Sequence, residues 1–207
     1  MSREILNHLI NQHRNIEGLL RILERQLASI RSGDRPDYFL MNDIIRYLTY
    51  YPDHYHHPFE DMIYACLAEK HPEYSAIVAD VEGQHGRIDL RGNVLRESID
   101  GIIRGSVISR DQIYNDGMDY IELYREHMQT EEDDLFDALS INLEPADWTA
   151  LTESFQWLPD PISADEVQRE YIYLKECITR EGAGTWPWKE CLTGSCPVCS
   201  SIEETAN

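Results

Sequence analysis

Four long segments of the sequence carry apolar residues at steps of three and four, and each segment places one histidine within its apolar stripe. In the first segment, Ile5, Leu9 and Ile16 open a stripe that continues to Ile30, and His13 occupies one of its positions. This spacing is typical of an amphipathic helix with one buried face. The pattern therefore predicts helices whose buried faces each contain an imidazole.

The other three segments repeat this arrangement at about residues 39–69, 74–102 and from 109 onward. Their stripe histidines are His56, His85 and His127. Pro52 and Pro58 fall within the second segment, which is either one bent helix or two shorter ones. Gly83 and Gly86 flank the third histidine and predict tight packing there.

Short connections between four helices favour an all-α fold, an antiparallel up-down-up-down four-helix bundle. We assign residues 1–142 to this bundle and residues 143–207 to a C-terminal extension with short helices and a cysteine-containing tail. One short helix is expected over Pro145–Leu158, and another is expected after the capping residues Ser163 and Glu166.

Two of the stripe histidines are followed four residues later by a glutamate. The pairs are His56 with Glu60 and His127 with Glu131, and residues four apart share one face of a helix. A single buried histidine is usually a hydrogen-bonded core residue. Four at matching depth with two carboxylates would be costly without a partner, and a pair of metal ions removes that cost. The candidate ligands are His13, His56, Glu60, His85, His127 and Glu131.

The second segment allows a different register, because His57 and Asp61 are also four residues apart. The stripe favours His56 and Glu60, so we expect His57 beside the ligands or at the surface. Glu17 and Asp89 follow stripe histidines but lie beside the stripe, which predicts a supporting or surface position. The histidines expected at the surface are His8, His54 and His71.

The order of these motifs resembles the hemerythrin-like, or HHE, cation-binding family. Residues 56–61 read His-His-Pro-Phe-Glu-Asp and residues 127–132 read His-Met-Gln-Thr-Glu-Glu, with His13 before them and His85 between them. The resemblance covers about residues 4–140. It implies a four-helix bundle with two iron ions bridged by an oxo or hydroxo group, and it implies that the six candidate ligands hold them.

One position departs from the pattern of the oxygen-carrying hemerythrins, which have a fifth histidine near the third-helix histidine. Here that position is Val81. A set of four histidines leaves open or water-filled positions on iron, which favours reactivity over reversible oxygen carriage. A tyrosine is an alternative occupant of such a position, although core packing is the preferred interpretation for the candidates. These are Tyr51, Tyr55, Tyr120 and Tyr124. A ferritin-like site is disfavoured, because only Glu82 and His85 form its Glu-x-x-His motif.

The tail holds a second group of possible ligands. Its cysteines are Cys191, Cys196 and Cys199, and Cys177 lies upstream. We rank an unliganded or redox-active thiol pair first, a zinc site second and an iron–sulfur or rubredoxin-like iron site third. Cys66 lies between apolar residues and is expected in the core.

Charge narrows the functional classes. The chain has 18 basic and 38 acidic residues, a formal net charge of −20, which argues against nucleic-acid and anionic-membrane partners. We see no signal peptide and no membrane span, and therefore expect a cytoplasmic protein. The first hypothesis is a di-iron protein that binds, senses or reacts with O2, NO or peroxide in stress response or in iron and oxygen handling. The second is an oxidase, peroxidase or NO reductase served by a redox partner protein or the tail thiols. The third is an iron-handling or interaction module without catalysis.

Overall fold

The computed structural model describes residues 2–155 together with residues 171, 172, 174 and 176, and these residues are helical apart from short connections. The regular elements are α1 (Ser2–Ser32), α2 (Tyr38–Tyr51), the π-helix η1 (Pro52–His56), α3 (His57–Lys70), the 3-10 helix η2 (Pro72–Tyr74), α4 (Ser75–Ile103), α5 (Arg110–Thr130), the π-helix η3 (Glu131–Leu135), α6 (Phe136–Asn142) and α7 (Pro145–Ser154).

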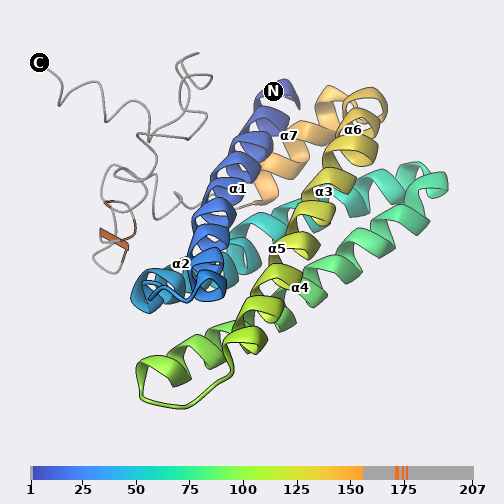
Figure 1. Ribbon diagram of the computed structural model, residues 1–207. Helices are drawn as coiled ribbons and strands as arrows, with labels where there is room; N and C mark the ends of the chain where they lie inside the picture. The colour runs from blue at the N-terminus through green and yellow to red at the C-terminus, as the bar shows by residue number, and fades with distance from the viewer. Residues whose placement is uncertain (1, 156–170, 173, 175, 177–207) are drawn as a thin grey trace, which may run out of the picture.

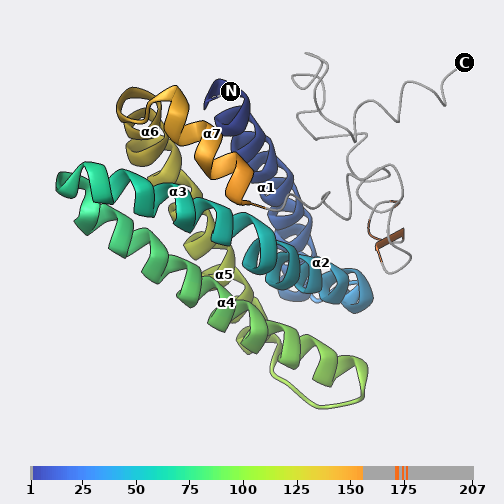
Figure 2. The same ribbon diagram turned by 180° about the vertical axis from the view of Figure 1, so that it is seen from behind.

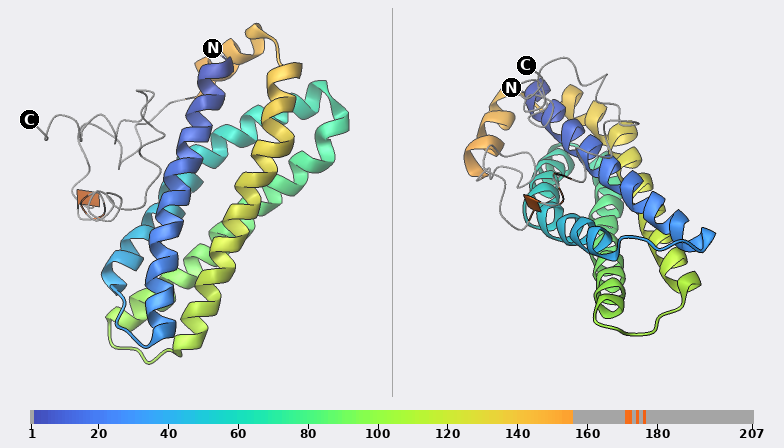
Figure 3. Two further views of the ribbon diagram at one scale, coloured as in Figure 1. Left: turned by 45° about the horizontal axis from the view of Figure 1, so that its top comes forward. Right: turned by 60° about the vertical axis from the view of Figure 1, so that its left-hand side comes forward.

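Four helical segments form the bundle, because α2, η1 and α3 follow one another without a break, as do α5, η3 and α6. Successive segments run in opposite directions, which Figure 1 and the left view of Figure 3 show. Helix α1 packs against α5 and α2, while α4 packs against α5 and against both α2 and α3. The predicted all-α bundle is confirmed, and the second segment is one continuous helix with a π-turn.

Local sequence signals account for several helix ends. The Asp37 carboxylate accepts a hydrogen bond from the Leu40 N–H at 3.0 Å and caps α2. The Ser109 hydroxyl accepts one from the Gln112 N–H at 3.4 Å and caps α5. Gly33 follows α1 with a φ of 89°, a left-handed conformation that glycine adopts without strain.

The apolar core consists of two clusters along the bundle, and each segment passes from one to the other at its histidine. In α1, Leu9 belongs to one cluster and Ile16 to the other, on either side of His13. In α4, Val81 and Ile88 are divided in the same way around His85. The four stripe histidines therefore lie at one level of the bundle, between two apolar layers.

The tight packing predicted at Gly83 and Gly86 is wrong. A Cβ atom on Gly83 would meet only an arginine side-chain end at 3.9 Å, and one on Gly86 would meet nothing within 4 Å. The close approaches are elsewhere: a Cβ on Gly92 would lie 2.5 Å from Thr49 Cγ2, and one on Gly117 would lie 2.6 Å from Leu27 Cδ1. These two glycines let α4 approach α2 and let α5 approach α1.

The first part of the extension packs on the bundle. Helix α7 lies against α3, as Figure 2 shows, and buries Trp148 and Leu151 in the core cluster that includes Phe59. It ends at Ser154, before the predicted Leu158. The division at residue 142 remains a prediction. None of the helices within the described ranges is both long and apolar enough to cross a membrane.

The helix predicted after Ser163 and Glu166 lies largely outside the described residues. Cys177, Cys191, Cys196 and Cys199 lie outside them too, so the proposed thiol, zinc and iron alternatives for the tail remain predictions. Cys66, which we expected in the core, is half-buried and packs against the cluster around Phe59.

Candidate metal centre

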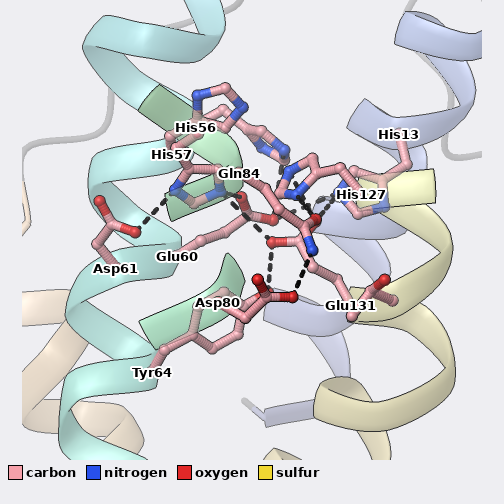
Figure 4. Close-up of polar contacts among 12 residues, drawn as sticks. His13, His56, His57, Glu60, Asp61, Tyr64, Asp80, Gln84, His127 and Glu131 are labelled. Carbon is pink, nitrogen blue, oxygen red and sulfur yellow. Dashed lines mark hydrogen bonds and ion pairs between the residues drawn. The ribbon is translucent and has the colours of Figure 1, made fainter. Parts of the chain in front are cut away.

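Seven polar side chains converge between the two apolar layers of the bundle (Figure 4), and each is at most 7% exposed. They are His13 of α1, His56 of η1, His57 and Glu60 of α3, His85 of α4, His127 of α5 and Glu131 of η3. The structure thus brings all six sequence-predicted ligands together and adds His57. Their role as metal ligands stays a prediction of the sequence.

Two π-turns lie in the segments that carry five of these side chains, namely His56, His57, Glu60, His127 and Glu131. The His57 N–H bonds the Pro52 carbonyl, and the Phe136 N–H bonds the Glu131 carbonyl, so each turn spans five residues instead of four. Pro58 lies two residues after the end of η1 and has no N–H to donate to the preceding turn, which favours a loosened helix there. The wider turn directs both His56 and His57 into the bundle.

Six of the seven side chains form two groups that share the carboxylate of Glu60. One group is His57, Glu60, His85 and His127, and the other is His13, His56 and Glu60. Within each group the potential ligand atoms lie within 4.8 Å of one another.

Glu131 also reaches both groups. Its carboxylate lies 3.3 Å from His13 Nε2 and 3.2 Å from His127 Nε2. Two carboxylates, Glu60 and Glu131, therefore lie between a pair of imidazoles and a trio of imidazoles.

Every histidine of the cluster is oriented by a hydrogen bond through its Nδ1 atom. The partners are Glu132 for His13 at 2.9 Å, Gln12 for His56 at 3.0 Å, Asp53 for His57 at 3.1 Å, Asp61 for His85 at 2.8 Å and Gln84 for His127 at 3.2 Å. Each partner atom is a carboxylate or amide oxygen, which accepts a hydrogen. The proton is therefore assigned to Nδ1, which leaves the Nε2 lone pair facing the centre, as metal-bound histidines require.

The atoms that face the centre have no hydrogen-bond partner among the described residues. They are the Nε2 atoms of His13, His57, His85 and His127, both carboxylate oxygens of Glu60 and one oxygen of Glu131. Leaving a buried polar group unpaired costs about 1–3 kcal/mol, and more for a charged one. Imidazole nitrogens and carboxylate oxygens are the donors that iron, manganese and zinc accept. The residues present therefore fit a pair of such ions.

Protonation of the cluster is strongly perturbed by burial and by its neighbours. Burial raises the pKa of Glu60 to about 8, and the Glu131 carboxylate adds to the rise. Burial lowers the pKa of His127 to about 3. Burial also opposes protonation of His85, but the hydrogen bond to Asp61 and the nearby Glu131 carboxylate outweigh it and raise the pKa of His85 to about 10. Metal ions would take the place of bound protons here, so binding is expected to release protons.

Tyr64 is a site residue that the sequence analysis missed. Its buried hydroxyl donates a hydrogen bond to Glu131 Oε1 at 2.9 Å. The signal was present, because Tyr64 follows Glu60 by four residues and so shares its helix face. Of the tyrosines considered instead, Tyr120 is buried in the neighbouring core cluster and Tyr55 packs against it. The ring of Tyr124 lies 6.3 Å from that of His57 and 6.2 Å from that of His127. Tyr51 accepts a hydrogen bond from Gln12 at 2.7 Å.

His57 does not lie at the surface, one of the two positions expected for it. It is 3% exposed, and its Nε2 atom points into the cluster. Asp61, its partner in the alternative register, turns away and supports His85. Asp89 accepts a hydrogen bond from the Asn93 side chain, and Glu17 pairs with Arg21 and Arg125 at the surface.

The remaining histidines and Val81 lie close to where we expected them. His8 and His54 are exposed, whereas His71 is partly buried. Val81 is fully buried in the apolar core, so no fifth histidine stands at that position of the third helix.

A helical bundle with a buried cluster of histidines and glutamates defines a class of cation-binding domains. The family described as the hemerythrin HHE cation binding domain matches residues 4–139, and the chain belongs to this family. Comparison with curated proteins and with solved structures gave no significant match. The matched residues include every member of the buried cluster, which supports a metal site at that cluster.

Proposed function

We propose that this protein holds two iron ions in the cluster and binds, senses or reacts with O2, NO or peroxide. The observation that carries the proposal is the set of five buried imidazoles gathered around Glu60 and Glu131, with every Nε2 atom except that of His56 lacking a hydrogen-bond partner among the described residues. A pair of iron ions would supply open coordination positions and electrons for binding or reducing such molecules.

The uneven division of imidazoles indicates which side would react. His57, His85 and His127 supply three imidazoles to one group, whereas His13 and His56 supply two to the other. With both carboxylates shared, the two-histidine side has one protein ligand fewer. The open position is therefore proposed at the side of His13 and His56. The fifth imidazole comes from His57, next to His56, in place of the residue absent at Val81.

The protein itself contributes orientation and exclusion of water. Hydrogen bonds donated by the five Nδ1–H groups hold the imidazole rings, and the Tyr64 hydroxyl donates a hydrogen bond to one oxygen of Glu131. The apolar layers above and below keep the site dry, which strengthens its electrostatic interactions.

The test is the metal content and optical spectrum of protein purified without added metal. We expect about two irons per chain, and the variant His127→Ala should hold less than half of that. The control His8→Ala changes an exposed histidine and should keep the full content. Zinc alone, or a folded protein without metal, would contradict the proposal. Mixing the reduced protein with O2, NO or hydrogen peroxide then identifies the ligand, and sustained consumption with a reductant would make it an enzyme.

A further inference from the structure

A groove between α2 and α4 lies next to the candidate centre, but none of the seven converging side chains lines it. Its volume is about 600 Å³, which is in the range of pockets that hold small organic molecules. Its lining carries both charges: Asp53 and Asp89 supply carboxylates, and Arg46 and Arg96 supply guanidinium groups. The way these charges are separated indicates the class of ligand that the groove can hold.

Two carboxylates lie together at one end of this groove. One oxygen of Asp53 accepts a hydrogen bond from His57 Nδ1 at 3.1 Å, while its other oxygen is buried without a hydrogen-bond partner. Burial and the neighbouring Asp53 carboxylate raise the pKa of Asp89, so the two acids stand close to each other. Within the described part of the chain, no lysine or arginine forms an ion pair with either of them. This end of the groove can therefore accept a positively charged group.

Arg96 supplies a positive charge farther along the same helix. Its guanidinium donates a hydrogen bond to the side-chain oxygen of Asn93 at 3.1 Å, and Asn93 in turn donates one to Asp89. The Nε atom of Arg96 is buried and has no hydrogen-bond partner, and no carboxylate of the described residues forms an ion pair with this guanidinium. The neutral Asn93 thus stands between opposite charges that are seven residues, or about 10 Å, apart along α4.

A ligand that satisfies both ends carries a positive and a negative group close together. Two hydrogen bonds of about 2.9 Å each span more than half of the 10 Å, so little distance is left between the ligand's own charges. A simple anion would meet the two acids, and a simple cation would leave Arg96 uncompensated. Aromatic rings complete the lining, because Tyr50 is 45% exposed on α2 and Tyr171 of the extension packs 5.9 Å from the Tyr47 ring. Such rings favour an ammonium group or an apolar side chain.

We propose that the α2–α4 groove binds a free amino acid as a zwitterion. The ammonium group is held by Asp53 and Asp89, and the carboxylate is held by Arg96. The side chain of the amino acid lies between Tyr50 and Tyr171. This second site does not depend on the metal proposed for the centre, and it gives a described residue of the C-terminal extension a part in binding.

The first test is isothermal titration calorimetry of the purified full-length protein with each of the standard amino acids in turn. We expect at least one of them to bind with a dissociation constant below about 1 mM. Its amide keeps only the positive charge and its deaminated acid keeps only the negative one, so each should bind at least about tenfold more weakly. The proposal is overturned if no amino acid binds, or if either analogue binds as tightly as the amino acid itself.

The second test removes one charge from each end of the groove. Arg96→Gln and Asp89→Asn should each weaken binding of that amino acid by about tenfold or more. The matched controls are Arg104→Gln and Glu97→Gln, at exposed positions near the end of the same helix that do not line the groove, and their affinities should stay within about twofold. Unchanged affinity in either groove variant, or equal weakening in the controls, would overturn the proposal. Thermal unfolding verifies that each variant folds, and the analogues test the unaltered protein should one variant fail to fold.

Discussion

The two uninterrupted helices and the two interrupted segments contribute unequally to the centre. Helices α1 and α4 supply one converging side chain each, His13 and His85. The segments with π-turns supply the other five, including the adjacent pair at 56 and 57. A regular helix directs residues four apart to one face, but not neighbouring residues. The π-turns are therefore what makes the site dense, in keeping with their frequent occurrence at functional sites.

The largest effect is expected from removing one residue of η1. Deleting His54 should convert the π-turn into a regular turn and rotate α2 against α3 by about 100°. Either the core face of α2 or the ligand face of α3 is then misdirected, so we expect a loss of stability above about 3 kcal/mol and loss of both metal ions. Thermal unfolding and metal analysis measure this. The control His54→Ala keeps the turn and should change stability by less than about 1 kcal/mol; full metal content in the deletion variant would show that the π-turn is dispensable.

The next effect compares a shared ligand with an unshared one. Glu60 belongs to both groups, whereas His85 belongs to one. Glu60→Ala should reduce metal content from about two ions per chain to below about 0.5, while His85→Ala should retain about one. Metal analysis after gel filtration, with circular dichroism to verify folding, distinguishes them. Equal losses in the two variants would mean that the groups do not bind metal independently.

A smaller loss of metal affinity is expected from removing Asp61, which lies on a segment with a π-turn and supports His85 on the uninterrupted helix α4. Asp61 of α3 holds His85 Nδ1 of α4 at 2.8 Å. Asp61→Ala should weaken metal affinity by about 10- to 100-fold, because the imidazole loses its fixed orientation. Competition with a chelator measures the affinity. Glu69→Ala, an exposed acidic residue of the same helix, is the control, and an equal change in both would assign the effect to surface charge.

The smallest effect is expected at Tyr64. Tyr64→Phe removes the hydroxyl that donates to Glu131 and keeps the packed ring, so we expect about 1 kcal/mol of lost stability with metal content unchanged. Chemical denaturation and metal analysis measure the two quantities. Loss of metal in this variant would give the phenol a larger role at the centre than hydrogen bonding.

The sequence predicted the site residues of regular helices better than those whose position depends on a π-turn or on contacts between helices. His13, His85 and His127 interrupt apolar stripes of regular helices, so a constant helical period finds them. His57 was misplaced because the period changes at η1, and a π-turn leaves only the indirect signal of flanking prolines. The prediction of tight packing at Gly83 was wrong for a related reason. The presence of a glycine in the sequence does not indicate whether another helix lies close to it.

By itself, the sequence determined that the chain folds into amphipathic helices and that four histidines and two glutamates, those of the apolar stripes, face their common interior. This was possible because helical periodicity is a local property: the spacing of apolar residues along the sequence indicates which face of a helix is buried. Only the tertiary structure decided that His57 joins the cluster, that Glu60 and Glu131 lie between both groups, and that Glu132 orients His13 across two helices. Those contacts join residues as many as 119 positions apart, and their geometry depends on how whole helices pack against one another.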